Sequence, residues 1–146
     1  MSDRPSPQPR SSYRVFRSIP TRWMDNDLYG HVNNAHYYSF FDSAINHYLI
    51  TAGGLDIEAG ATVGYIVSSR CEYFRPIRYP DAIEVGVCTD RVGNSSATYG
   101  VAIFIPGEVE ARASGAMTHV FVDRASSRPA PIPARLRAAL EAIARR

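Results

Sequence analysis

The sequence predicts one α+β domain, in which a curved antiparallel β-sheet is wrapped around one long central α-helix. Apolar residues recur with a period near 3.6 from Asn34 to Ala52, which predicts the helix. Alternation of apolar and polar residues then dominates from Val63 to Val122, which predicts strands. Turn residues interrupt this alternation at short intervals, so the strands are expected to follow one another as antiparallel hairpins.

The composition bounds the class of protein. With 146 residues, of which 45% are hydrophobic and 21% charged, the chain is expected to form a single soluble domain with its own core. The net charge of +2 is small and the basic residues are scattered, which argues against a nucleic-acid partner. Arginine suits phosphate groups, so an anionic small ligand stays open.

The compartment is expected to be the cytoplasm. Cys71 and Cys88 do not form a C-x-x-C motif and are interpreted as two apolar thiols in a reducing environment. The first residues lack the apolar segment of a secretion signal, and no apolar run approaches the roughly 18 residues of a membrane span. We therefore expect no membrane partner.

The chain divides into three parts. Residues 1–12 are rich in Pro, Ser and Arg and are expected to be a disordered tail. Residues 13–123 form the folded domain, and residues 124–146 a Pro-rich linker with a short C-terminal helix that begins at Ala134 and either packs on the body or stays mobile. The apolar side of that helix consists of Leu136, Leu140 and Ile143.

Residues 13–24 alternate and predict the first strand. Its two expected faces consist of Val15, Ile19 and Trp23, and of Phe16 and Met24. Pro20 lacks an N–H donor, so this strand is expected at an edge of the sheet or at a bulge.

The long helix is the most clearly patterned element. Asn33 or Asn34 is expected to cap its start, and Gly53 and Gly54 to end it. Its apolar stripe consists of Ala35, Tyr38, Phe41, Ile45, Tyr48, Leu49 and Ala52.

Four alternating runs follow the helix, at 63–73, 83–87, 97–105 and 109–122. In the first run one face is expected to consist of Val63, Tyr65, Val67, Ser69, Cys71 and Tyr73. An open sheet has edges to protect, so we expect a homodimer that joins two sheets into one, or a homotetramer.

The polar stretch from residue 25 to residue 37, DNDLYGHVNNAHY, holds the densest group of side chains able to move or orient a proton. Its place between a strand and a helix predicts a tight loop, in which Gly30 adopts a backbone angle that other residues resist. The free N–H groups at a helix start suit a developing oxyanion. This loop is therefore the candidate active site.

This stretch resembles the motif of the 4-hydroxybenzoyl-CoA thioesterase-like family, and its HVNN segment resembles the plant-type acyl-ACP thioesterases. The order of elements is similar to the hot-dog fold, in which a sheet wraps one long helix. The segment 74–81 resembles the second landmark of the family, with Pro80 where glycine is common. The resemblance covers residues 13–123 and implies hydrolysis of an acyl-CoA thioester, with acyl carrier protein as an alternative carrier.

The resemblance also implies roles for single residues. Asp27 takes the place of the catalytic carboxylate, acting as nucleophile or as general base. The backbone N–H groups of Asn34 and Ala35 polarise the thioester carbonyl. His31 assists, by orienting Asp27 or a water molecule or by giving a proton to the departing thiolate. Tyr29 stands where the acyl-ACP branch has asparagine, so the Asp-Asn-His arrangement of that branch does not transfer whole.

Catalytic roles are thus expected for Asp27, His31 and Asn34. The expected substrate contacts are Tyr29, Gly30, Asn33, Ala35, Tyr37, Tyr38 and Ser69. We expect no metal and no cofactor apart from the CoA of the substrate, because the histidines lack the flanking pattern of a zinc site and no nucleotide-binding glycine motif is present.

Three alternatives stay open. Asp25 and Asp27 are also suited to be turn or capping acids without a catalytic role. The same fold suits a non-catalytic acyl-CoA-binding protein, or a dehydratase of hydroxyacyl thioesters that uses His31 with an acid. A serine hydrolase is disfavoured, because the G-x-S-x-G motif is absent.

Overall fold

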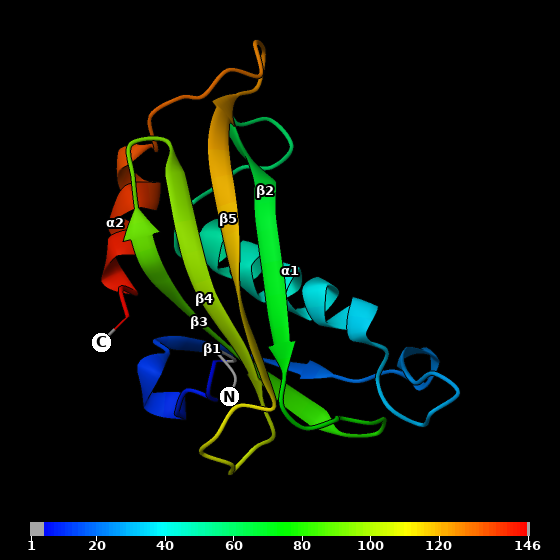
Figure 1. Ribbon diagram of the computed structural model, residues 1–146. Coiled ribbons are helices and arrows are strands. Elements are labelled where there is room, and N and C mark those ends of the chain that lie inside the picture. Colours follow the sequence, from blue (N-terminus) through cyan, green and yellow to red (C-terminus); the bar gives the residue numbers. More distant parts are fainter. Residues whose placement is uncertain (1–4, 146) are drawn as a thin grey trace.

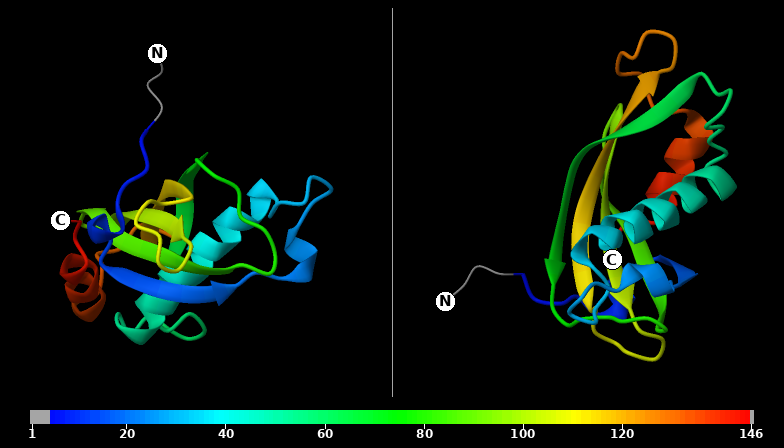
Figure 2. Two further views of the ribbon diagram at one scale, coloured as in Figure 1. Left: turned by 90° about the horizontal axis from the view of Figure 1, so that it is seen from below. Right: turned by 90° about the vertical axis from the view of Figure 1, so that its right-hand side faces the viewer.

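A computed structural model describes residues 5–145 as one antiparallel sheet of five strands in the order β1-β3-β4-β5-β2, with two α-helices (Figure 1). The elements are β1 (Val15–Pro20), α1 (Asn34–Thr51), β2 (Thr62–Tyr73), β3 (Ala82–Val92), β4 (Ser96–Phe104), β5 (Ala113–Asp123) and α2 (Ala134–Ala142). The sheet curves around α1, and α1 covers only one face of the sheet (Figure 2). The predicted α+β class and its hot-dog arrangement are confirmed.

The main core lies between α1 and the concave face of the sheet. Its helical part consists of Tyr37, Phe40, Phe41, Ala44, Ile45 and Leu49. This buried face differs from the predicted stripe, because Ala35 and Ala52 are exposed and Tyr38 is half-buried. The helix is apolar on more than one side, and the sheet covers only one of them.

The first strand is shorter than predicted. It ends at Pro20, which pairs with Ala82, and the chain then forms a 3-10 helix over Trp23–Asp25. Trp23 is therefore 81% exposed instead of lying on a strand face. The predicted edge position of this strand is confirmed, since β1 pairs with β3 alone.

The long strand β2 contains a bulge that the alternation did not predict. Ile66 pairs with His119, but Ser68 pairs with Thr118, so Val67 is the extra residue. The residues that share the concave face are therefore Gly64 and Ile66 before the bulge, and Ser69, Cys71 and Tyr73 after it. The prediction of a single face from Val63 to Tyr73 is wrong, because one inserted residue reverses the parity of the strand.

The two ends of the chain pack on the body. The predicted tail ends earlier than residue 12: Arg10–Ser12 form a 3-10 helix, and Arg10 makes an ion pair with Glu84 at 2.9 Å. This segment lies on the face of the sheet opposite α1 (Figure 2), and residues 1–4 lie outside the described residues. At the other end, the predicted apolar side packs on the core, with Leu136 and Leu140 of α2 and with Ile143, which follows the last residue of α2.

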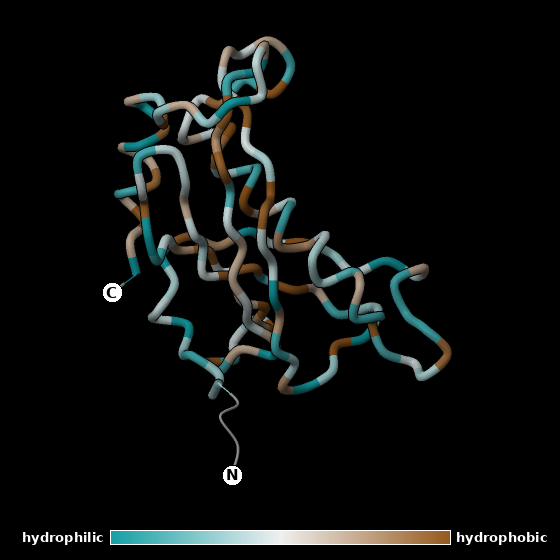
Figure 3. Tube along the Cα trace, turned by 45° about the horizontal axis from the view of Figure 1, so that its top comes forward, coloured by the Kyte–Doolittle hydropathy of each residue, from teal (hydrophilic) through white to brown (hydrophobic). Residues whose placement is uncertain are grey.

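Hydrophobic segments run along α1 and along the strands, including the middle of β2 at the sheet edge (Figure 3). In the part of the chain that the structure describes, neither helix is long and apolar enough to cross a membrane.

Candidate active site

The polar loop is a compact turn that its own backbone closes. The Gly30 N–H donates to the Asp27 carbonyl at 3.0 Å, and the Asp27 N–H donates to the His31 carbonyl at 2.9 Å. Gly30 has a φ of +79°, the left-handed backbone conformation that the sequence predicted for it. The turn therefore fixes Asp27 just before the start of α1.

The buried side chain of Asp25 holds this loop in place. Its side chain is fully buried, and its Oδ1 lies 2.8 Å from Arg22 Nη2. Its Oδ2 accepts the Arg22 N–H at 2.8 Å, and its carbonyl accepts the Asn33 N–H at 2.9 Å. Asp25 is thus a structural acid, in agreement with the turn or capping interpretation.

Asp27 is held differently. Its carboxylate is half-buried and accepts two hydrogen bonds, from the Tyr29 N–H at 2.9 Å and from Asn33 Nδ2 at 3.3 Å. Asn33 also caps α1, because its Oδ1 accepts the Ala35 N–H at 3.0 Å. One side chain therefore connects the Asp27 carboxylate to the first turn of the helix.

Only one of the two predicted backbone donors is available. The Ala35 N–H is already bonded to the Asn33 cap. The Asn34 N–H has no hydrogen-bond partner among residues 5–145. Its own carbonyl accepts the Tyr73 hydroxyl at 3.2 Å, which ties the end of β2 to the first turn of α1. The positive end of the helix dipole thus leaves the backbone N–H of Asn34 available to a ligand.

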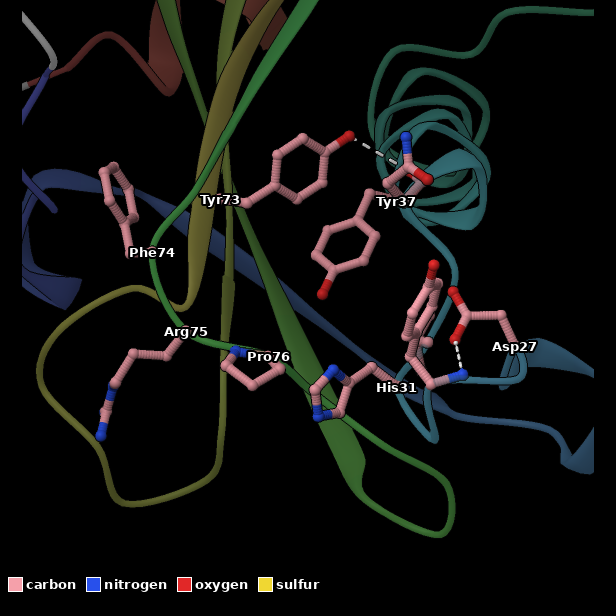
Figure 4. A pocket seen from close by; sticks show the side chains of 10 residues that line it. Asp27, His31, Tyr37, Tyr73, Phe74, Arg75 and Pro76 are labelled. Atoms are coloured by element: carbon pink, nitrogen blue, oxygen red, sulfur yellow. Dashed lines mark hydrogen bonds between the residues drawn. The ribbon is translucent and has the colours of Figure 1, made fainter.

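Asp27 faces a cleft of about 470 Å³ between the start of α1 and the end of β2 (Figure 4). The cleft is lined by Asp27, Tyr29, His31, Val32, Asn34, Tyr37, Tyr73, Phe74, Arg75 and Pro76. Five of these residues were predicted for the site. Tyr73, Phe74, Arg75 and Pro76 were not predicted as site residues, although the last three belong to the segment 74–81 that resembles the second landmark of the family.

His31 lies on the other side of this cleft from Asp27. Figure 4 shows its imidazole beside Pro76 and turned away from the carboxylate. Among residues 5–145, no hydrogen bond joins the His31 ring to Asp27, so the interpretation that His31 orients Asp27 finds no support in the geometry. The ring instead faces the space that a ligand would occupy.

Two tyrosines form an aromatic wall. The rings of Tyr37 and Tyr73 meet edge to face with their centroids 4.9 Å apart. Burial raises the pKa of Tyr37 to about 12, so its hydroxyl is protonated at neutral pH. The wall is therefore uncharged and suited to an apolar or flat group.

Five of the seven predicted contact residues do not line the cleft. Ser69 is exposed in the middle of β2, on the concave side and in register with Met117. Tyr38 packs edge-on against Phe41 with a centroid separation of 6.4 Å. Gly30, Asn33 and Ala35 shape the loop and the cap and do not line the cleft.

Arg75, at the rim of the cleft, is ion-paired with Glu108. Arg75 Nη2 lies 2.8 Å from Glu108 Oε1, and Arg112 Nη2 lies 2.7 Å from Glu108 Oε2. The hydrogen bond from Arg112 lowers the pKa of Glu108. Within residues 5–145, no three His, Cys, Asp or Glu side chains come together as metal ligands.

The chain belongs to the thioesterase-like superfamily, whose family model matches residues 21–140. The crystal structure of the PA5185 protein from Pseudomonas aeruginosa strain PAO1 is similar, with 52% identity and a TM-score of 0.94 over 95% of this chain and 97% of that one. The PA2801 protein from Pseudomonas aeruginosa, a candidate thioesterase, has 31% identity and a TM-score of 0.77 over 85% and 95% of the two chains.

One curated relative also matches, the uncharacterized protein YsmA from Bacillus subtilis strain 168. The identity is 26% over 96 residues, which cover 66% of this chain and 65% of that protein. The match therefore spans slightly less than two thirds of the relative.

Proposed function

We propose that this protein is an acyl-CoA thioesterase in which the Asp27 carboxylate attacks, or activates water to attack, the thioester carbonyl. One observation carries this proposal. Asp27 is held by Tyr29 and Asn33 at the wall of a cleft, next to the helix start that presents the Asn34 N–H. Acyl transfer to water requires a carboxylate and a backbone hydrogen-bond donor that line the same ligand-binding space.

The proposed reaction uses groups of the chain and water. The attacking oxygen, from Asp27 or from water, bonds to the carbonyl carbon, and the Asn34 N–H stabilises the resulting oxyanion. If water attacks, Asp27 takes its proton as the new carbon–oxygen bond forms. The carbon–sulfur bond then breaks, and the thiolate leaves with a proton from His31 or from solvent. Asp27 then releases its proton to solvent, and solvent returns a proton to His31 if His31 gave one. If Asp27 attacks directly, water hydrolyses the mixed anhydride and returns the free carboxylate.

The proposed substrate enters past Tyr29, whose side chain is 88% exposed at the mouth of the cleft. The acyl group contacts the Tyr37 and Tyr73 wall, and CoA takes part only as the carrier of that group. Acyl carrier protein is the alternative carrier. We expect the reaction to take place in the cytoplasm.

We also propose that the active form is a dimer joined through β2. This strand of 12 residues lies at the sheet edge, and its exposure is symmetric: six exposed residues, 65–70, stand between three half-buried residues on each side. The exposed six include Tyr65, Ile66 and Val67, at 51%, 39% and 60% exposure. An antiparallel copy centred between Val67 and Ser68 would cover this segment and satisfy its free backbone groups.

The test is release of free thiol from short, long and aromatic acyl-CoAs by the wild-type protein, Asp27→Asn and Glu58→Gln. Loss of a nucleophile or general base is expected to lower kcat by about 10²–10⁴-fold in Asp27→Asn. Glu58→Gln is the matched acid-to-amide control, because Glu58 lies on an exposed loop outside the cleft, and wild-type activity is expected.

Two outcomes would contradict the proposal. Equal turnover by wild type and Asp27→Asn would remove Asp27 from the reaction. Binding of acyl-CoA without release by the wild type would favour the acyl-CoA-binding alternative. Label found in the Asp27 carboxylate after a single turnover in ¹⁸O-labelled water would establish direct attack by Asp27, because general-base catalysis places the label only in the product acid.

A further inference from the structure

The side of the cleft opposite Asp27 is a short segment without regular structure, the 74–76 wall. Phe74, Arg75 and Pro76 follow the end of β2, and all three line the cleft (Figure 4). Pro76 has no backbone N–H, so its carbonyl is the main-chain group through which the protein can hold it. The position of the wall therefore depends on what binds that carbonyl.

Arg112, the residue before β5, holds the 74–76 wall from outside the cleft. Its Nη1 donates to the Pro76 carbonyl at 2.7 Å. Its own carbonyl accepts the Phe74 N–H at 2.9 Å and the Arg75 N–H at 3.1 Å. Arg112 thus makes a hydrogen bond with each residue of the wall, although it lies 36 positions beyond Pro76 in the chain.

The Arg112 side chain is itself fixed by a carboxylate. Its Nε and Nη2 donate to the two oxygens of Glu108 at 2.8 and 2.7 Å, the bidentate geometry that fixes the plane of a guanidinium. Figure 4 shows Arg75 pointing toward the loop that carries Glu108, and Arg75 Nη2 donates to Glu108 Oε1 at 2.8 Å. The Glu108 carbonyl accepts Nε and Nη2 of Arg10 at 3.1 and 3.0 Å, so this loop is held from the N-terminal segment as well.

These contacts place Arg112 where it acts on the wall and not on the ligand. Its side chain is 18% exposed and does not line the cleft, whereas the side chain of Arg75 is 54% exposed and does. The hydrogen bond between Arg112 and Glu108 raises the pKa of the arginine and lowers that of the acid. Both groups therefore stay charged at neutral pH.

The 74–76 wall continues into the loop that carries Asp27. Ile77 follows Pro76 and is buried in the core, and its carbonyl accepts the Val32 N–H at 2.8 Å. Val32 also lines the cleft. The hydrogen bond from Arg112 to Pro76 is thus one residue away from the bond that joins the two sides of the cleft.

We propose that Arg112 is a positioning residue of the Asp27 cleft, which fixes the 74–76 wall through the Pro76 carbonyl and thereby determines how tightly the acyl part of the substrate is bound. This inference rests on the proposed thioesterase function. In this role Arg112 touches neither the substrate nor Asp27, so its loss acts on KM and leaves the chemical step in place.

The exposure of Pro76 separates positioning from stability. Because Pro76 is exposed, water replaces the lost hydrogen bond when the Arg112 side chain is shortened. Arg112→Gln also keeps the backbone carbonyl that binds the Phe74 and Arg75 N–H groups. We therefore expect the variant to fold with a Tm within about 4 °C of wild type, while the wall loses its fixed position.

The first test is thiol release by wild type, Arg112→Gln and Arg145→Gln. For an acyl-CoA that wild type hydrolyses, KM is expected to rise about tenfold or more in Arg112→Gln, with kcat within about threefold of wild type. Arg145→Gln is the matched control, because Arg145 also binds a carboxylate, Asp90, at 2.6 Å, but lies outside the cleft. Its KM is expected to equal that of wild type. An unchanged KM in Arg112→Gln, or an equal rise in both variants, overturns the proposal.

An uncharged carrier distinguishes positioning from direct contact. The same acyl group on pantetheine has no phosphate groups that a guanidinium could bind. Because a positioning residue acts on the acyl part, Arg112→Gln is expected to raise KM for acyl-pantetheine by the same factor as for acyl-CoA. A rise limited to acyl-CoA would make Arg112 a phosphate ligand and overturn the proposal.

Arg112→Lys tests whether the planar guanidinium is needed. Lysine keeps the positive charge but carries a single nitrogen, which cannot bind the Pro76 carbonyl and both Glu108 oxygens at once. KM is therefore expected to stay within about threefold of the Arg112→Gln value. A full return to the wild-type KM would show that charge alone is sufficient, and the role through Pro76 would be wrong.

Hydrogen exchange separates this inference from the thioesterase proposal. The Val32 N–H reports on the wall, because it donates to Ile77 next to Pro76. Its protection factor is expected to fall about tenfold in Arg112→Gln and to stay at the wild-type value in Arg145→Gln. Such a fall supports the fixed wall even if wild type hydrolyses no acyl-CoA. An unchanged protection factor overturns it even if wild type is an active thioesterase.

Discussion

The two edges of the sheet differ in how they are protected. β1 has six residues, ends at Pro20 and pairs along its whole length with β3. β2 has 12 residues, contains no proline and exposes Tyr65, Ile66 and Val67. Short length and proline blunt an edge, whereas a long apolar edge invites another strand.

This difference supports the proposed pairing of two subunits through β2. The Asp27 cleft borders β2 through Tyr73, and a second cavity of about 270 Å³, lined by Asn46, His119 and Arg124, borders β2 through Gly64. Neither of them is lined by a residue of β1. The unprotected edge is thus also the edge that borders both of these spaces.

The largest expected effect comes from placing a charge on the unprotected edge. Val67 lies next to the centre of the proposed pairing, so Val67→Lys sets two lysines close together across the two-fold axis. We expect the dimer Kd to rise at least 100-fold and thiol release to fall with it. Sedimentation equilibrium and the acyl-CoA assay measure the two effects.

Ser18→Lys is the matched control on β1, where Ser18 is exposed and pairs with Glu84. It is expected to leave both the mass and the activity unchanged. If Val67→Lys stays dimeric, or if Ser18→Lys dissociates the protein instead, the assignment of the two edges is reversed.

A smaller effect on stability is expected when the pH is lowered. Burial holds the pKa of His119 at about 4, below its unfolded value near 6.5, so the unfolded chain binds the proton first as the pH falls. Stability is therefore complete above pH 6.5 and is lost through the window down to pH 4. The loss from this group between pH 7.5 and pH 5 is about 2 kcal/mol.

Urea unfolding of wild type and His119→Gln at the two pH values measures this loss as a difference. Because His119 pairs with Ile66 of β2, the protection factors of backbone amides are expected to fall at pH 5 in β2 and β5 before β1. An equal loss of stability in His119→Gln would contradict the assignment to His119.

The smallest expected effect concerns the protected edge. Pro20→Ala restores an N–H at the end of β1 but leaves the strand short and fully paired with β3. We expect a change in unfolding free energy within about 0.5 kcal/mol and no new oligomer. Higher oligomers of Pro20→Ala in sedimentation velocity would show that proline alone keeps this edge closed.

Much of the site could be predicted because its residues are neighbours in sequence. Asp27, Gly30 and Asn33 act within one turn, so the local pattern was sufficient to place the acid, the positive φ and the cap. The His31 side chain turns away from Asp27 and lines the cleft together with Pro76, a residue far from it in the chain, which a local pattern does not contain.

The sequence by itself determined the helix, the strand order along the chain and the loop that carries the acid, because periodicity, capping and turn chemistry act over a few residues. Only the tertiary structure decided that Val67 is a bulge, that the Tyr73 hydroxyl bonds to the Asn34 carbonyl and that the Tyr99 hydroxyl pairs with His119 Nδ1. These three features join residues far apart in the chain, and their contacts form only when the sheet folds around the helix.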